Sequence, residues 1–198
     1  MIIAITGTTS GVGKHLVNEL KVEHKIVEIT REVFDLNFPE TITSFGKVDV
    51  LINCAGHDLG GKVSFKEHDW DSCQKIINTN LISAIKLSQL AIQENEHVTI
   101  VNITSTNVDK FYPGDLVYSL SKKSLQTFSD MLRYEHPTVK VKEVILGLTK
   151  TNFNENRHKM NHKPIDDLYA MNHLLPEYVA KTIAKFVFDD SEVIRIAP

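Results

Sequence analysis

Short apolar runs alternate along the chain with longer segments that have helical spacing. The runs are rich in β-branched residues and most are apolar on both faces, as in parallel strands that helices cover on both sides. We expect them to be strands, at residues 2–6, 25–30, 33–35, 48–53, 98–104, 140–146 and 193–196.

The segments between the runs carry apolar residues every three or four positions, which predicts helices at residues 12–20, 69–93, 116–135 and 176–188. Residues 37–47 leave room for only one or two helical turns. The alternation has no linker and no internal repeat. We therefore expect one α/β domain over residues 1–198, a doubly wound parallel sheet in a three-layer α/β/α sandwich.

The composition fits one hydrophobic core and limits the kinds of binding partner to expect. The chain has 198 residues, of which 42% are hydrophobic and 24% charged. The net charge of −3 gives no reason to expect a nucleic-acid or membrane partner. The two cysteines do not suggest a disulfide, and no apolar stretch approaches the roughly 18 residues of a membrane span. We expect a cytoplasmic protein.

A glycine-rich turn follows the first apolar run. Residues 6–13 read T-G-T-T-S-G-V-G, and the segment after them has helical spacing. Glycines let the backbone approach an anion, and free N–H groups at the start of a helix receive it, so the turn predicts a phosphate site. A glycine-rich turn without a ligand is the alternative, and the flanking strand and helix argue against it.

Tyr118 and Lys122 lie one helical turn apart and share a face of the predicted helix. A positive charge about 4 Å from a phenol is worth roughly 4 kcal/mol at a dielectric near 20, which is about 3 pKa units. Lys122 is therefore expected to lower the pKa of Tyr118 towards the range of a general acid or base.

These motifs resemble those of the compact, classical type of the short-chain dehydrogenase/reductase family, over nearly the whole chain. Residues 48–56 read V-D-V-L-I-N-C-A-G, with Cys54 where the family usually has a second asparagine. Asn80 matches the active-site asparagine of the next helix, and Ser105 matches the serine 13 positions before the tyrosine (118 − 105 = 13). Residues 146–151 match the family's Pro-Gly pair and threonine after the sixth strand, with Leu146 in place of the proline.

The resemblance implies a Rossmann-type fold and an NAD(P)-dependent oxidoreductase that transfers hydride between a nicotinamide and a small carbonyl or alcohol substrate. Tyr118 would supply the proton, and Ser105 would hydrogen-bond the carbonyl oxygen. Lys122 would lower the pKa of the phenol and contact the ribose hydroxyls of the nicotinamide. Asn80 would hold a water molecule behind Lys122 that replaces the proton given up by Tyr118. No metal is expected.

The resemblance also implies the cofactor site. Arg31 stands at the end of a strand where an acid would favour NAD, and its guanidinium suits a 2′-phosphate, so NADP(H) is favoured over NAD(H). Glu32 beside it leaves a solvated charge as the alternative. Asp35 resembles the aspartate that contacts the adenine edge. The cofactor-binding residues are expected to be Gly7, Thr9, Ser10, Gly11, Val12, Gly13, Arg31, Asp35, Leu36, Asn53, Ala55, Gly56, Tyr118, Lys122, Gly147, Thr149 and Thr151.

Residues 152–175 resemble the family's mobile substrate lid. Arg157, Lys159 and Lys163 make the segment basic, which would suit an anionic substrate or a carrier-protein handle. Two aspartates follow directly, so a plain solvated loop is the simpler interpretation. His158 and His162 are four positions apart, but no third metal ligand is evident.

Two other functions remain open from the residues. A non-catalytic NADP-binding sensor on the same fold would not need all of Asn80, Ser105, Tyr118 and Lys122. A nucleotide-sugar epimerase would need a larger lobe after Thr151. A carbonyl reductase that prefers NADPH is the leading interpretation.

The helices at 69–93 and 116–135 resemble those that pair across a two-fold axis in many family members. Each has apolar residues beside its main stripe, so we expect a homodimer or homotetramer. Scattered exposed residues that need no partner are the alternative. The residues in question are Ile76, Ile85, Leu87, Leu116, Phe128 and Met131.

Overall fold

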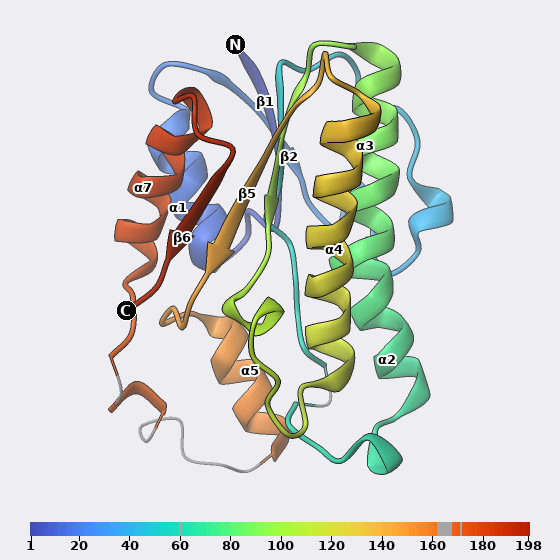
Figure 1. The fold of residues 1–198 in the computed structure, drawn as a ribbon, viewed down its shortest axis with the longest axis vertical. Coiled ribbons are helices and arrows are strands. Elements are labelled where there is room, and N and C mark those ends of the chain that lie inside the picture. Colours follow the sequence, from blue (N-terminus) through green and yellow to red (C-terminus); the bar gives the residue numbers. More distant parts are fainter. Residues whose placement is uncertain (60, 162–167, 171) are drawn as a thin grey trace.

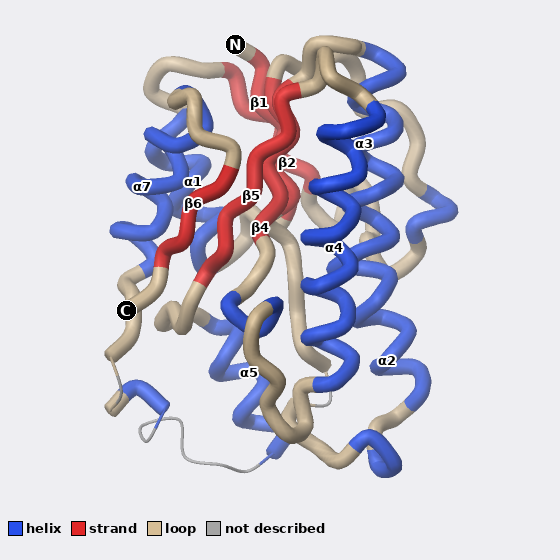
Figure 2. Tube along the Cα trace, viewed as in Figure 1, coloured by secondary structure: helices blue, strands red, loops and turns tan. Residues whose placement is uncertain are grey.

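The computed structural model describes residues 1–59, 61–161, 168–170 and 172–198. Its centre is one parallel sheet of six strands in the order β2-β1-β3-β4-β5-β6 (Figures 1 and 2). The predicted doubly wound, Rossmann-type sheet is thus confirmed. The strands are β1 (Ile2–Thr6), β2 (Lys25–Ile29), β3 (Val50–Asn53), β4 (Thr99–Ile103), β5 (Lys140–Leu146) and β6 (Val193–Ile196).

Helices cover both faces of the sheet. α1 (Gly11–Leu20) and α7 (Pro176–Phe188) lie together on one face, and α3 (Ser83–Glu94) and α4 (Leu116–Glu135) lie on the other, with α2 (Trp70–Ile77) running into α3 (Figure 1). α5 (Asn152–Asn161) lies beyond the carboxyl ends of the strands. That end of the sheet is where parallel α/β folds bind ligands.

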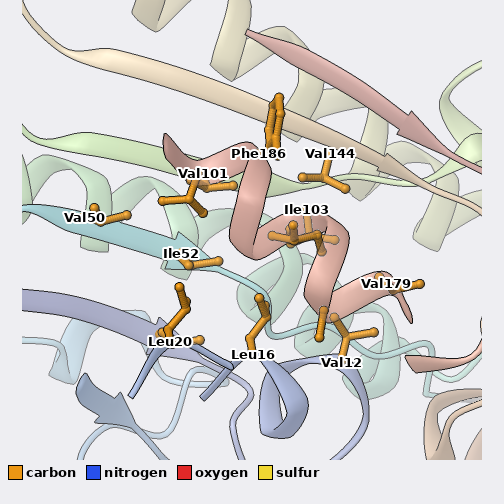
Figure 3. Close-up of a cluster of buried hydrophobic side chains, with 14 of the residues drawn as sticks. Val12, Leu16, Leu20, Val50, Ile52, Val101, Ile103, Val144, Val179 and Phe186 are labelled. Atoms are coloured by element: carbon orange, nitrogen blue, oxygen red, sulfur yellow. The ribbon is translucent and has the colours of Figure 1, made fainter. Parts of the chain in front are cut away.

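Alternation along the strands divides the core between the two faces. Ile3 and Ile5 point towards α1 and α7, where they pack with Leu16 and Phe186 in the cluster of Figure 3, whereas Ala4 faces the α3–α4 side. Burying a side chain such as Leu16 stabilises the fold by roughly 1.5–3 kcal/mol. Both faces of the sheet therefore pack against helices in a hydrophobic core.

A π-helical segment, Asn78–Ile82, joins α2 to α3. The sequence predicts one helix at 69–93, and the chain is indeed helical from Trp70 to Glu94, but its middle turn is wider than an α-turn. Asn80 lies in this segment and is only 1% exposed. Single π-turns within helices often occur at functional sites, and this one aims an asparagine inward.

The prediction of a strand at residues 33–35 is wrong. The carbonyl of Thr30 accepts the N–H groups of both Val33 and Phe34, at 3.0 and 2.9 Å, so the chain turns back after β2. Asp35 then accepts two hydrogen bonds from Asn37. A backbone used in these local bonds cannot pair with a strand. The short helix expected in residues 37–47 is a single 3₁₀ turn, Pro39–Thr41.

The apolar residues expected at an interface fall into three groups by burial. Ile76 and Leu87 are fully buried, so the prediction that they lie beside the main stripe is wrong; the buried stripe of these helices is wider than the sequence suggested. Ile85 and Phe128 are half-buried. Leu116 and Met131 on α4 are 53% and 64% exposed, as expected.

Candidate active site

A cavity of about 830 Å³ runs along the carboxyl ends of the strands, from the glycine-rich turn to α5. The segments that follow β1 and β3 line it, and between these two strands the strand order reverses, which is the usual ligand position in doubly wound sheets. The volume is within the range of pockets for small molecules and cofactors.

The turn between β1 and α1 is built for an anion. Gly7 has φ of 71°, and a Cβ on Gly13 would lie 2.2 Å from the Gly7 carbonyl oxygen, so no side chain fits there. Ser10 makes no side-chain cap on α1, which leaves the first N–H groups of the helix for another partner. Thr8 Oγ1 is buried without a hydrogen-bond partner among the described residues. These features fit a dinucleotide phosphate.

Three of the four predicted catalytic residues converge on the cavity. Ser105 follows the end of β4, and Tyr118 and Lys122 lie one turn apart on α4; all three are nine-tenths buried or more and line the pocket. The Ser105 hydroxyl is near enough to the phenol of Tyr118 to lower its pKa. The Lys122 ammonium donates to the carbonyl of Ile103 at 2.8 Å. The arrangement brings a phenol, a hydroxyl and an amine to one small volume.

Asn80 lies behind this group and does not line the cavity. Its Oδ1 accepts from the N–H of His57 at 2.9 Å, and its Nδ2 donates to the carbonyl of His57 at 2.9 Å and to Ser121 at 3.1 Å. A Cβ on Gly56 would lie 3.2 Å from Lys122 Nζ and 3.3 Å from Asn80 Oδ1. Asn80 therefore fastens the loop after β3 to α4 just behind the lysine.

The pKa of Tyr118 does not move in the expected direction. Burial raises it to about 12, while the nearby Ser105 hydroxyl and the charge of Arg157 both lower it. Burial also lowers the pKa of Lys122 to about 8. Above that pH most of the lysine is neutral and carries no charge that could act on the phenol. The expectation that Lys122 lowers the phenol's pKa is thus not met, because desolvation of the phenol is the largest effect.

The lowered pKa of Lys122 makes stability depend on pH. Between about pH 8 and 10.5 the unfolded lysine holds a proton that the folded one has lost, so the unfolding free energy of the wild type rises with pH. We expect it to rise by up to about 3 kcal/mol relative to Lys122→Met. Urea titrations at pH 7, 8.5 and 10 measure this difference, with Lys123→Met as an exposed control on the same helix. A difference that is flat with pH would contradict it.

Most residues predicted to bind the cofactor line the cavity; Asn53 does not. Its Nδ2 donates to Asn102 Oδ1 at 2.8 Å and to Ser88 Oγ at 3.3 Å, so the side chain turns towards α3 and α4. Arg31 is exposed at the rim. The other predicted residues along the cavity are Gly7, Thr9, Ser10, Gly11, Val12, Gly13, Asp35, Leu36, Ala55, Gly56, Gly147, Thr149 and Thr151.

The sequence reasoning missed a group of charged residues on the side of α5. Arg157, taken as part of a solvated loop, is only 9% exposed and forms ion pairs with Asp58 and Asp115. Lys62 approaches Asp115 to 3.7 Å. No local motif marks these residues, because their partners are far apart in the chain. His57, also missed, lines the cavity, and burial lowers its pKa to about 4.

Comparisons with known proteins agree with this geometry. The sequence model of the short chain dehydrogenase family matches residues 27–162. The 3-ketodihydrosphingosine reductase of Bacteroides thetaiotaomicron is 31% identical over 182 residues, which cover 79% of this chain and 67% of the relative. The NADP-dependent 3-hydroxy acid dehydrogenase of Schizosaccharomyces pombe is 26% identical, with 91% and 84% covered.

Solved structures show the same fold. A serine dehydrogenase in complex with NADP⁺ superposes with a TM-score of 0.79 over 99% of this chain and 94% of that one, at 22% sequence identity. Similar folds have been solved with NADP and with NADH bound.

A parallel sheet with a glycine-rich turn after its first strand and a serine, tyrosine and lysine at its carboxyl edge is typical of a class of dinucleotide-dependent oxidoreductases. The family match over residues 27–162 makes the assignment specific. The chain belongs to the short-chain dehydrogenase/reductase family and is an NAD(P)-dependent oxidoreductase. A non-catalytic sensor on the same fold is not favoured.

Proposed function

We propose that the protein is an NADPH-dependent carbonyl reductase whose catalytic residues are Ser105, Tyr118 and Lys122, with Asn80 as a positioning residue behind them. The observation that carries the proposal is the convergence of Ser105, Tyr118 and Lys122 on the cavity that begins at the glycine-rich turn. The names of the relatives, a ketone reductase and a hydroxy acid dehydrogenase, support a carbonyl/alcohol pair as substrate.

The proposed mechanism assigns one task to each side chain. When bound, the nicotinamide supplies or accepts the hydride. The hydroxyl of Ser105 donates to the substrate oxygen, on which negative charge develops, and the phenol of Tyr118 gives that oxygen its proton. Lys122 holds positive charge behind the phenol when it is protonated, and Asn80 keeps the loop after β3 in place.

A panel of aldehydes, ketones and 3-oxo esters, each assayed with NADPH and with NADH and followed at the nicotinamide absorbance, tests the proposal. Turnover of at least one carbonyl compound that depends on Tyr118 supports it. Tight NADPH binding without turnover of any carbonyl compound or of the corresponding alcohols would instead favour a non-catalytic NADP-binding sensor.

The proposed preference for NADPH depends on Arg31. Its side chain is exposed at the end of the cavity that also holds Asp35 and Leu36, just after β2. A guanidinium at this position can make charge-assisted hydrogen bonds to a 2′-phosphate, which NAD lacks.

Arg31→Ala is expected to weaken NADPH binding ten- to a hundredfold, because a hydrogen bond to a charged group is worth roughly 1.5–3 kcal/mol. NADH binding should change less than about threefold, and Arg31→Asp should reverse the preference. Fluorescence titration of both dinucleotides measures these affinities. The control is Lys25→Ala, an exposed cation at the other end of β2. Equal wild-type affinities for NADH and NADPH would sink this interpretation.

We also propose a homodimer or homotetramer, formed through α4. Leu116, Leu120, Met131 and Tyr134 are all more than half exposed on this helix. A cytoplasmic location remains a proposal as well. None of the described helices is long and apolar enough to cross a membrane, and both cysteines are free thiols.

A further inference from the structure

Arg157 reaches from α5 into the side of the cavity where a substrate would meet Tyr118. Its guanidinium carbon lies 5.7 Å from the centre of the Tyr118 ring. Nε lies 2.6 Å from Asp58 Oδ2, and Nη2 donates to Asp115 Oδ1. The guanidinium is thus held over the proposed proton donor by two carboxylates from different loops.

The two carboxylates have different positions. Asp58 is 5% exposed, does not line the cavity and supports Arg157 from behind. Asp115 lines the cavity, where it also accepts from Asn107 Nδ2 at 3.1 Å. Arg157 and Lys62 line the same wall. The charges that line the cavity on this side are therefore two cations and one carboxylate that already accepts several donors.

The guanidinium retains donors for a ligand. Arginine has five N–H groups, and the contacts that the described residues make with Arg157 engage Nε and Nη2. A buried ion pair is weak evidence of stabilisation, because desolvation of both charges offsets most of their attraction. A functional task explains better why a fixed arginine lies beside the reacting group.

We propose that Arg157 binds a carboxylate of the substrate, so that the preferred substrates are oxo and hydroxy acids whose carboxylate lies a few bonds from the reacting carbon. The inference rests on the proposed carbonyl reductase activity and deepens it. Charge-assisted N–H···O bonds of about 2.7–2.9 Å to the guanidinium would fix one end of the acid. The other end would then present its carbonyl oxygen to Tyr118 and Ser105.

The test compares one acid with its uncharged ester. The wild type, Arg157→Lys and Arg157→Met are assayed with NADPH on 3-oxobutanoate and on methyl 3-oxobutanoate. Because a lone Asp58 would be left buried in Arg157→Met, the double variant Arg157→Met/Asp58→Asn is included. Arg195→Met, which removes an ion pair with the half-exposed Asp109 outside the cavity, is the matched control. NADPH affinity is measured for each variant to verify the fold.

We expect the Arg157→Met variants to lose ten- to a hundredfold more kcat/KM for the acid than for the ester, and the extra loss to lie mainly in KM. Any loss that the two substrates share reflects the charge that Arg157 places beside Tyr118. Arg157→Lys should fall between, and the control should match the wild type. Equal losses for acid and ester, with NADPH binding intact, would show that the ion pairs only fasten α5 and would overturn the proposal.

The outcome also separates this inference from the proposed function. If the wild type reduces the ester but does not prefer the acid, the reductase stands and the carboxylate site is rejected. If no carbonyl compound is turned over, the reductase fails, and calorimetry with the unreactive acid 3-methylbutanoate in the presence of NADPH decides on the site. Binding to the wild type that is lost in the double variant supports it, and equal binding or none rejects it.

Discussion

Tyr118→Phe is expected to lower the rate of carbonyl reduction by 10²–10⁴-fold, the usual contribution of a general acid, while NADPH still binds. The substitution removes the phenolic hydroxyl, which lies near Ser105, and keeps the ring. The ring retains its contacts with Phe153, at 5.5 Å between centroids, and with Arg157. Steady-state kinetics and NADPH titration on the same preparation separate the two effects.

Tyr178→Phe is the matched control, since it makes the same change on α7, outside the cavity, at a side chain that is 57% exposed. It should behave as the wild type. A Tyr118→Phe enzyme that keeps more than about a tenth of the wild-type rate would reject the phenol as the proton donor.

Gly13→Ala is expected to weaken NADPH binding on the order of a hundredfold, because the new Cβ would overlap the Gly7 carbonyl oxygen at 2.2 Å. The contact is with backbone, so relief requires a shift of the turn or of the start of α1. Either movement displaces the N–H groups that would hold the phosphate. Fluorescence titration with NADPH, together with circular dichroism, measures binding and fold separately.

Gly46→Ala provides the comparison. Gly46 has φ of 82° in an exposed loop, and a Cβ there would meet nothing within 4 Å. That variant should lose stability, by about 1 kcal/mol, without losing affinity for NADPH. If Gly13→Ala binds NADPH within threefold of the wild type, the turn is not the phosphate site.

The elements that the sequence predicts best are those with local signals at both ends. The helix at 116–135 and the strand at 140–146 have the predicted bounds. Between them, the helical spacing of apolar residues gives way within a few positions to a short run that includes β-branched residues. The segment at 33–35 has a strand-like composition, but three residues are too few to compete with the hydrogen bonds of the turn at Thr30. Tertiary and turn contacts decide such short runs.

In the site, too, features set by local sequence could be predicted and those set by long-range contacts could not. Tyr118 and Lys122 are paired by helical geometry alone, so their spacing is readable in the sequence. The orientation of Asn53 is not, because neighbouring positions at a strand end face opposite sides. The environment of Arg157 depends on Asp58 and Asp115, which precede it by 99 and 42 positions (157 − 58 and 157 − 115). Long-range ion pairs leave no periodic signal.

The π-turn at Asn78–Ile82 is equivalent to one extra residue stored inside a continuous helix. In an ordinary α-helix, deleting a residue rotates everything on one side of the deletion by about 100°. Here a deletion would convert the wide turn into an α-turn, and Ile76 and Leu87 on its two sides would keep facing their cores. The fold could thus survive the loss of the feature that orients Asn80, and a descendant that no longer needs the asparagine could shed it without rebuilding the protein.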